Sequence, residues 1–134
     1  ILSVICLSFA NKNLADFREL LEKLKLLMTK DKVFLNPDLN LELLSNYLAI
    51  SEKHCSYMLN KGLNMNFNQY VNNFRIEAFK ERIKEGQNKN FTLTSIAYDC
   101  GFNSKSTFNR VFKSSCGVTP SEFVKTTIGK PTSD

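Results

Sequence analysis

The chain has 134 residues, a formal net charge of +5, and hydrophobic and charged fractions of 43% and 23%, which are ordinary values for a globular protein. They exclude disordered, collagen-like and coiled-coil proteins, and the length suits one domain with a real core. Only 5 Gly and 3 Pro interrupt the chain, which favours helices over a strand-rich sandwich. The basic excess suits a polyanionic partner but is too mild to establish one.

The N-terminal segment Ile1–Ala10 is strongly apolar. It has half of the roughly 20 residues that a membrane-spanning helix requires. Three roles stay open: the inner end of a membrane span, a short docking segment, or the start of a buried helix. Because the chain lacks an initiator Met, we expect it to be a fragment of a longer protein.

Apolar side chains recur every three or four residues along Asn13–Lys30, a spacing that predicts an amphipathic helix. The turn-prone stretch Asn36-Pro37-Asp38 ends this region. We therefore expect residues 1–35 to form an apolar segment and a linker helix. A leucine stripe of this size does not stay exposed to water, so it predicts either docking on the core or dimerisation through residues 13–30.

A pair of short helices is predicted next. Asn40 is a good N-cap residue, and the helix after it has an apolar face that includes Tyr47. Ala49 makes a tight turn, and Ser51 caps a second helix that places Cys55 inward. A small residue in such a turn, followed by an apolar one, is the sequence form of a helix-turn-helix.

The same pattern returns near the C-terminus. Thr92 caps a helix, Gly101 makes the turn, and Ser104 caps the next helix. This is an internal repeat of a two-helix unit. A closing helix begins at Pro120, which suits the first turn of a helix. The two units predict DNA binding, because the second helix of a helix-turn-helix lies in the major groove.

A long helix over residues 68–85 is predicted to connect the two units. Its apolar stripe runs from Tyr70 to Ile83, and its basic residues, Arg75 among them, alternate with glutamates. At 1.5 Å per residue this helix is roughly 27 Å long, and successive major grooves on one face of B-DNA are about 34 Å apart. Together with the turns at its ends, this helix is long enough to place two recognition helices in adjacent major grooves.

Helical spacing identifies the outward faces of the two recognition helices. The planar guanidinium of arginine can bond O6 and N7 of guanine together, and the asparagine amide suits adenine. Asn109 and Arg110 are therefore the strongest candidates for contacts to bases. Residues 38–62 contain two basic and three acidic side chains, whereas residues 86–126 contain five basic and two acidic ones. The second unit should therefore dominate phosphate attraction. We assign phosphate contacts to Asn60, Lys61, Ser104 and Lys113.

Several motifs resemble one family. The stretches Gly101–Lys113 (GFNSKSTFNRVFK) and Cys116–Phe123 (CGVTPSEF) are similar to the signature of AraC/XylS-type transcription regulators. Ile96–Phe102 (IAYDCGF) and the connector Tyr70–Glu81 (YVNNFRIEAFKE) extend the resemblance, which covers about residues 36–125. It implies a seven-helix DNA-binding domain with two helix-turn-helix motifs joined by a long helix.

The resemblance also implies base-reading positions, and these coincide with the outward faces. They are Lys53, Ser56, Tyr57, Lys105, Ser106, Asn109 and Arg110. The family often has arginine where this chain has Tyr57, which leaves the base preference of the first unit open. A narrower resemblance, around residues 60–75, is to members that are fused behind a sensor, often one borne by a membrane.

We therefore predict an all-α, non-enzymatic chain with the DNA-binding domain over residues 36–126 and a frayed tail at 127–134. Its expected partner is double-stranded DNA, and RNA polymerase and an upstream sensor domain are further candidates. We expect a cytoplasmic location, with the parent protein anchored in the inner membrane if the sensor is membrane-borne. The cysteines lack paired spacing and no catalytic constellation is present, so no cofactor or metal is expected. The alternative is a protein-interaction module that keeps the fold but no longer binds DNA.

Overall fold

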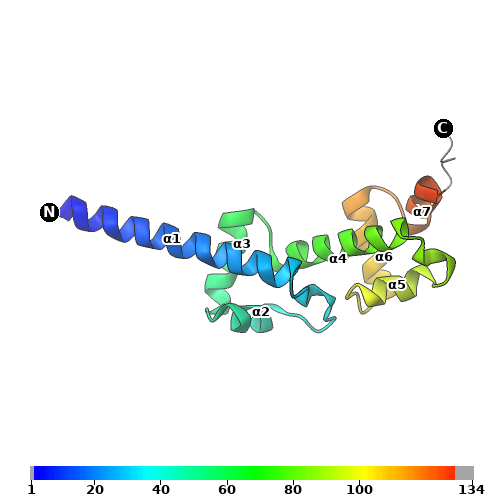
Figure 1. Cartoon of the computed structure of the whole chain (residues 1–134), viewed down its shortest axis with the longest axis horizontal. Coiled ribbons are helices and arrows are strands. Elements are labelled where there is room, and N and C mark those ends of the chain that lie inside the picture. Colours follow the sequence, from blue (N-terminus) through cyan, green and yellow to red (C-terminus); the bar gives the residue numbers. More distant parts are fainter. Residues whose placement is uncertain (1, 129–134) are drawn as a thin grey trace. The chain divides into compact units, whose positions relative to one another are not determined.

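The computed structural model describes residues 2–128, with side chains described over residues 16–127. These residues form seven α-helices and two short 3-10 helices, with no strand among them (Figure 1). The predicted all-α class is therefore confirmed, as are two helix-turn-helix pairs joined by a long helix. In chain order the elements are α1 (Leu2–Thr29), η1 (Val33–Leu35), α2 (Leu41–Leu48), α3 (Glu52–Leu63), α4 (Phe67–Lys84), η2 (Gln87–Lys89), α5 (Leu93–Asp99), α6 (Lys105–Cys116) and α7 (Pro120–Ile128).

The first helix begins earlier than the sequence pattern predicts. We expect a helix from Asn13, whereas α1 begins at Leu2 and ends at Thr29. No Gly or Pro precedes Pro37, so no helix breaker separates the apolar segment from the amphipathic one. Beyond the end of α1, Lys32 has a left-handed φ of 51°. Within the described residues, no helix combines the length and the apolar character needed to cross a membrane.

The described chain divides into two compact units. The first contains α1, α2 and α3, and the second contains α4 from Asn68 onward together with α5, α6 and α7. The segment Phe34–Asp38, which connects α1 to α2, belongs to the second unit. The domain boundary at residue 36 stays a prediction, and the predicted tail lies outside the described residues from residue 129 onward.

The first unit has a core to which all three of its helices contribute. α1 contacts both α2 and α3, and Leu24 and Met28 of α1 are buried. α2 and α3 add Leu44, Ser45, Leu48, Cys55, Met58 and Leu59. α1 is therefore an integral part of this unit, and the part of its leucine stripe that is described, from residue 17 to residue 28, packs on the helix-turn-helix pair.

One residue of the predicted apolar face is placed differently. Tyr47 is 44% exposed, so its prediction as an inward residue is wrong. Ser45 is buried in the eight-residue helix instead, and its Oγ donates a hydrogen bond to the carbonyl oxygen of Glu42 at 2.7 Å. That bond satisfies the buried hydroxyl, which explains how a polar side chain is accommodated in the core.

The second unit is built around α4. Ile76, Phe79 and Ile83 of that helix are buried against side chains from α5, α6 and the turn between them. These partners are Ile96, Ala97, Cys100, Phe102, Phe108 and Phe112. The helix predicted over residues 68–85 matches α4 to within one residue at each end.

Side-chain caps define where four helices begin. Each cap oxygen accepts a hydrogen bond from the backbone N–H three residues later, which satisfies one of the free donors of the first turn. The four pairs are Asn40 with Leu43 (2.8 Å), Ser51 with His54 (3.1 Å), Thr92 with Ser95 (3.1 Å) and Ser104 with Thr107 (3.2 Å). All four predicted caps are confirmed.

Candidate nucleic-acid interface

The second helix of the first unit, α3, has one buried and one exposed side. Cys55, Met58 and Leu59 are fully buried and determine the rotation of α3 about its axis. The opposite side carries the predicted contact residues. Lys53, Tyr57, Asn60 and Lys61 are exposed, and Ser56 is half-buried.

α6 occupies the equivalent position in the second unit. Phe108 and Phe112 are buried, with Val111 half-buried beside them. The predicted contact residues lie on the remaining surface of the helix. Lys105, Ser106, Asn109, Arg110 and Lys113 are exposed, and Ser104 is half-buried at the N-cap.

A cluster of aromatic rings holds α6 against α4. The centroid of Phe79 lies 4.8 Å from that of Phe108 and 5.5 Å from that of Phe112. Phe102, in the turn before α6, meets Phe108 edge-on at 5.1 Å. Offset and edge-on contacts of this kind add to the stabilisation from burial alone. The aromatic rings on the buried side of α6 thus pack closely beneath its exposed face.

The hydroxyl groups at the start of α6 are already engaged. Ser104 Oγ accepts the hydrogen bond from Thr107 that caps the helix, and it lies 3.0 Å from Ser106 Oγ. Two of the predicted contact residues are therefore linked to each other and to the cap. Either hydroxyl retains some capacity for an additional partner, because a hydroxyl group can donate once and accept twice.

All the charged residues of α6 are basic. Its sequence contains Lys105, Arg110 and Lys113 and no acidic residue, whereas α3 carries Glu52 in its first turn. The ion pairs among the described residues lie elsewhere, and each includes a basic residue of α4: Lys80 with Glu77, Arg82 with Asp99 of α5, and Lys84 with Glu81. The three cations of α6 are therefore not neutralised by an acidic partner in the described part of the chain.

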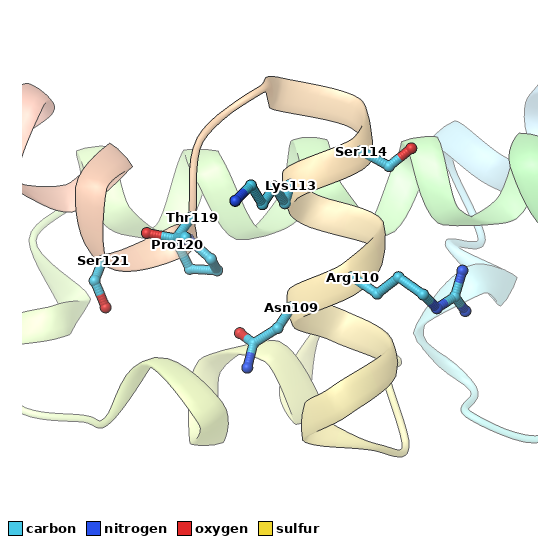
Figure 2. Close-up of a pocket in the computed structure, with 7 residues that line it drawn as sticks. All are labelled: Asn109, Arg110, Lys113, Ser114, Thr119, Pro120 and Ser121. Carbon is cyan, nitrogen blue, oxygen red and sulfur yellow. The ribbon is translucent and has the colours of Figure 1, made fainter.

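An open groove of about 720 Å³ runs beside α6. Figure 2 shows Asn109 and Lys113 on the side of α6 that faces the start of α7, and Arg110 and Ser114 on the other side. The groove is lined by Asn109, Arg110, Lys113, Ser114, Thr119, Pro120 and Ser121. Three predicted contact residues are thus brought to one surface feature.

The sequence patterns place a helix start at Pro120 but assign no contact to the α7 side of this groove. Thr119 Oγ1 accepts a hydrogen bond from the backbone N–H of Glu122 at 3.2 Å, so Thr119 caps α7 and places Pro120 and Ser121 at the groove. The Thr-Pro pair is a helix-start signal, and the closing helix predicted from Pro120 does begin there. Its proximity to Asn109, however, depends on how α6 and α7 pack.

Two cysteines are buried free thiols. Cys55 and Cys100 are both fully buried. Burial raises the pKa of the Cys55 thiol and raises the pKa of the Cys100 thiol to about 11. Both thiols are protonated at neutral pH and have the character of structural rather than reactive cysteines. Among the described residues, no group of three or more His, Cys, Asp or Glu side chains is placed to hold a metal ion.

Comparisons with known proteins agree with this geometry. A family model described as a helix-turn-helix domain matches residues 44–126, which is more than half of the chain. An uncharacterised HTH-type transcriptional regulator of Staphylococcus aureus (strain COL) is 35% identical over 86 residues, covering 64% of this chain. A counterpart in strain MRSA252 matches to the same extent. The chain spans only 11% of the length of these relatives.

Solved structures share the fold. The C-terminal domain of AraT, a response regulator from Geobacillus stearothermophilus, has a TM-score of 0.66 and 23% identity, covering 83% of this chain and 84% of its own. An AraC-type transcriptional regulator from Chromobacterium violaceum has a TM-score of 0.69 and 16% identity, covering 85% and 96%. The chain therefore belongs to the AraC-type helix-turn-helix family, as a DNA-binding domain of a transcription regulator.

Proposed function

We propose that this domain recognises specific double-stranded DNA sequences by placing α3 and α6 in two adjacent major grooves. The observation that carries the proposal is the exposed face of α6. It combines basic side chains that have no acidic partner within the described residues with two side chains, Asn109 and Arg110, that suit base edges. An interaction module that had lost DNA binding would have no need of that combination.

The proposed base contacts follow from side-chain chemistry. Arg110 can donate to O6 and N7 of a guanine together, and Asn109 can pair with N6 and N7 of an adenine. Lys105 and Ser106 lie one turn closer to the start of α6. On α3 the equivalent readers are Lys53, Ser56 and Tyr57, where the tyrosine can contact a phosphate or a thymine methyl group.

Phosphate contacts would set the register of the domain on the duplex. We assign them to Asn60 and Lys61 on the later turns of α3 and to Ser104 and Lys113 on α6. Because α6 carries three basic residues and no acidic one, the second unit supplies more of the electrostatic attraction. The first unit then contributes mainly to the choice of site.

The wider context is part of the same proposal. The relatives are far longer than this chain, so we propose that an upstream sensor domain controls the DNA-binding domain. We further propose a cytoplasmic location, with the parent protein anchored in the inner membrane. RNA polymerase is the proposed protein partner at a promoter. A dimer contact within residues 13–30 is proposed as well, and it would use the side of α1 that does not face α2 and α3, where Leu26 is 55% exposed.

A salt titration tests the proposal. The chain is first used to select duplexes from a random pool of about 30 base pairs, long enough for two sites one helical turn apart. Binding of the selected duplex and of a scrambled duplex is then measured across a range of potassium chloride concentrations. We expect tighter binding of the selected duplex, and a logarithmic slope of about −0.9 for each phosphate neutralised.

The outcomes separate the two functions. A flat salt response, or failure to enrich any duplex, would favour the protein-interaction module. Enrichment with a footprint over two adjacent major grooves on one face of the DNA would support bipartite reading. A footprint confined to one groove would contradict the role assigned to α3, while leaving α6 as a reader.

A further inference from the structure

Arg75 of α4 binds the short segment that follows α1 along the chain. The sequence predicts Arg75 among the alternating charges of the connecting helix, but its side chain is half-buried. Its Nε donates to the carbonyl oxygen of Phe34 at 2.8 Å, and its Nη2 donates to the carbonyl oxygen of Asn36 at 2.9 Å. A planar guanidinium that makes two such bonds fixes direction as well as distance. We call Phe34–Asn36 the strap.

The strap is also held by its first side chain. Phe34 is 5% exposed, and its ring stacks on that of Phe74 with centroids 5.7 Å apart. Burial lowers the pKa of the Arg75 guanidinium, which reflects the cost of removing that charge from water. The two strap carbonyls offset this cost, so releasing the strap would leave a half-buried cation without these partners.

The strap contacts the turn of the second helix-turn-helix. Gly101 has a φ of +110°, and a Cβ there would overlap the carbonyl oxygen of Phe34 and lie 2.7 Å from the Nε of Arg75. The Cζ of Arg75 lies 6.0 Å from the ring centroid of Phe102, which in turn packs on Phe108 of α6. Contacts therefore run without a break from the strap to the recognition helix.

The strap also lies close to α1 along the chain. Residues 30–33 alone separate the end of α1 from Phe34, and Lys32 among them has a left-handed backbone that side chains rarely adopt. The strap is therefore the first segment of the second unit that follows α1 along the chain.

We propose that Arg75 is a positioning residue that seats the strap against the Gly101 turn, and that the seated strap keeps α6 oriented for DNA binding. This inference rests on the proposed function. Release of the strap would loosen the turn and lower the DNA affinity of the second unit. Arg75 itself touches no DNA in this scheme.

The test compares three variants in the full chain. Arg75→Gln removes both the positive charge and the planar guanidinium that donates the two hydrogen bonds. Arg75→Lys keeps the charge but loses the planar guanidinium. Lys84→Gln is the matched control, because it removes one positive charge from the same helix at a side chain that is 59% exposed. Amide hydrogen exchange is followed in residues 34–38 and 100–103, and affinity is measured for the duplex selected by the unsubstituted chain.

We expect both Arg75 variants to accelerate exchange in the strap and in the turn together. We expect Arg75→Gln to bind DNA about tenfold more weakly than Lys84→Gln, the scale set by one hydrogen bond to a charged group. Arg75→Lys should be intermediate. If Arg75→Gln does not fold, the comparison of Arg75→Lys with the unsubstituted chain decides the matter.

Faster exchange in the strap alone, with the turn unchanged, would overturn the inference, as would equal affinities for Arg75→Gln and Lys84→Gln. Failure of the unsubstituted chain to bind any duplex would instead overturn the proposed function. The exchange experiment reports on the contact itself and needs no DNA. The two failures are therefore distinguishable.

Discussion

Gly62 of α3 and Phe17 of α1 meet so closely that no larger residue fits at position 62 without movement. A Cβ there would lie 2.9 Å from the Cζ of Phe17 and 3.4 Å from a methyl carbon of Leu21. Glycine inside a helix costs roughly 1 kcal/mol relative to alanine, so this position trades helix stability for close packing. The contact seats α1 directly on the first recognition helix.

We therefore predict that Gly62→Leu forces the Phe17 ring to move and loosens the packing of α1 on α3. Overpacking typically costs about 1–3 kcal/mol, but the crowded atom is the tip of a side chain that can rotate, and the substitution regains roughly 1 kcal/mol of helix stability. We therefore expect faster amide exchange in residues 16–29 than in the control, with little change in the midpoint of thermal unfolding. His54→Leu is the control, since it adds the same side chain at an exposed position of α3. If amide exchange in α1 is as slow in Gly62→Leu as in the control, the close contact between Gly62 and Phe17 is not needed to hold α1 on α3.

Local signals predicted the helix starts and the repeat. Asn40, Ser51, Thr92 and Ser104 are caps whose hydrogen bonds reach only three residues along the chain, so sequence alone identifies them. The inward residues of α3 and α6 follow from helical spacing in the same way. The outward faces, where the candidate site lies, are what remains once the inward residues are known.

Contacts between distant segments could not be predicted. The bond from Arg75 to Phe34 spans 41 positions, and nothing in the periodicity of α4 indicates that this arginine turns to a backbone carbonyl. The packing of Phe17 on Gly62 likewise joins residues that are far apart in the sequence. The exposure of Tyr47 could not be predicted for a similar reason. In a short helix, the side chains that become buried depend on which elements pack against the helix and not on spacing alone.

Arg110→Ala should weaken binding of the selected duplex and relax its sequence preference. A bidentate contact to guanine contributes about 1–3 kcal/mol of discrimination, so we expect roughly a tenfold or greater loss for the selected duplex and a smaller loss for a scrambled one. Both affinities are measured at one moderate salt concentration. An unchanged affinity would remove Arg110 from the proposed site.

Lys113→Ala provides the contrasting pattern. As a phosphate contact, Lys113 should contribute about equally to all sequences, and its loss should make the salt slope shallower by about one. The measurement is the salt titration of the selected and scrambled duplexes side by side. A loss confined to the selected duplex would instead assign Lys113 to base reading.

Ser104→Ala should destabilise α6 by removing its N-cap. Loss of a serine cap typically costs about 0.5–2 kcal/mol, which urea unfolding can resolve. Ser115→Ala is the control within the same helix, because Ser115 is exposed near its C-terminal end. If Ser104 also contacts a phosphate, its loss should lower DNA affinity under conditions in which both variants are fully folded. Equal affinities would restrict Ser104 to the capping role.

Alkaline pH should destabilise the domain through Cys100. Burial raises the pKa of this thiol from 9.0 to about 11, so the folded chain keeps a proton that the unfolded chain releases between these values. The stabilisation is complete below about pH 9 and is lost as the pH rises towards 11, and two pKa units correspond to about 2–3 kcal/mol. Burial also raises the pKa of Tyr70 to about 12, which adds a loss common to all variants.

Urea unfolding of the unsubstituted chain and of Cys100→Ala at about pH 8 and pH 10.5 separates the Cys100 contribution from that common loss. The alanine variant loses packing contacts at both pH values, so the informative quantity is the change between them. We expect that change to be smaller for Cys100→Ala, because the variant has no thiol to ionise on unfolding. Equal changes in the two proteins would show that ionisation of Cys100 is not coupled to unfolding, and would assign the alkaline loss to Tyr70 and the other titrating groups.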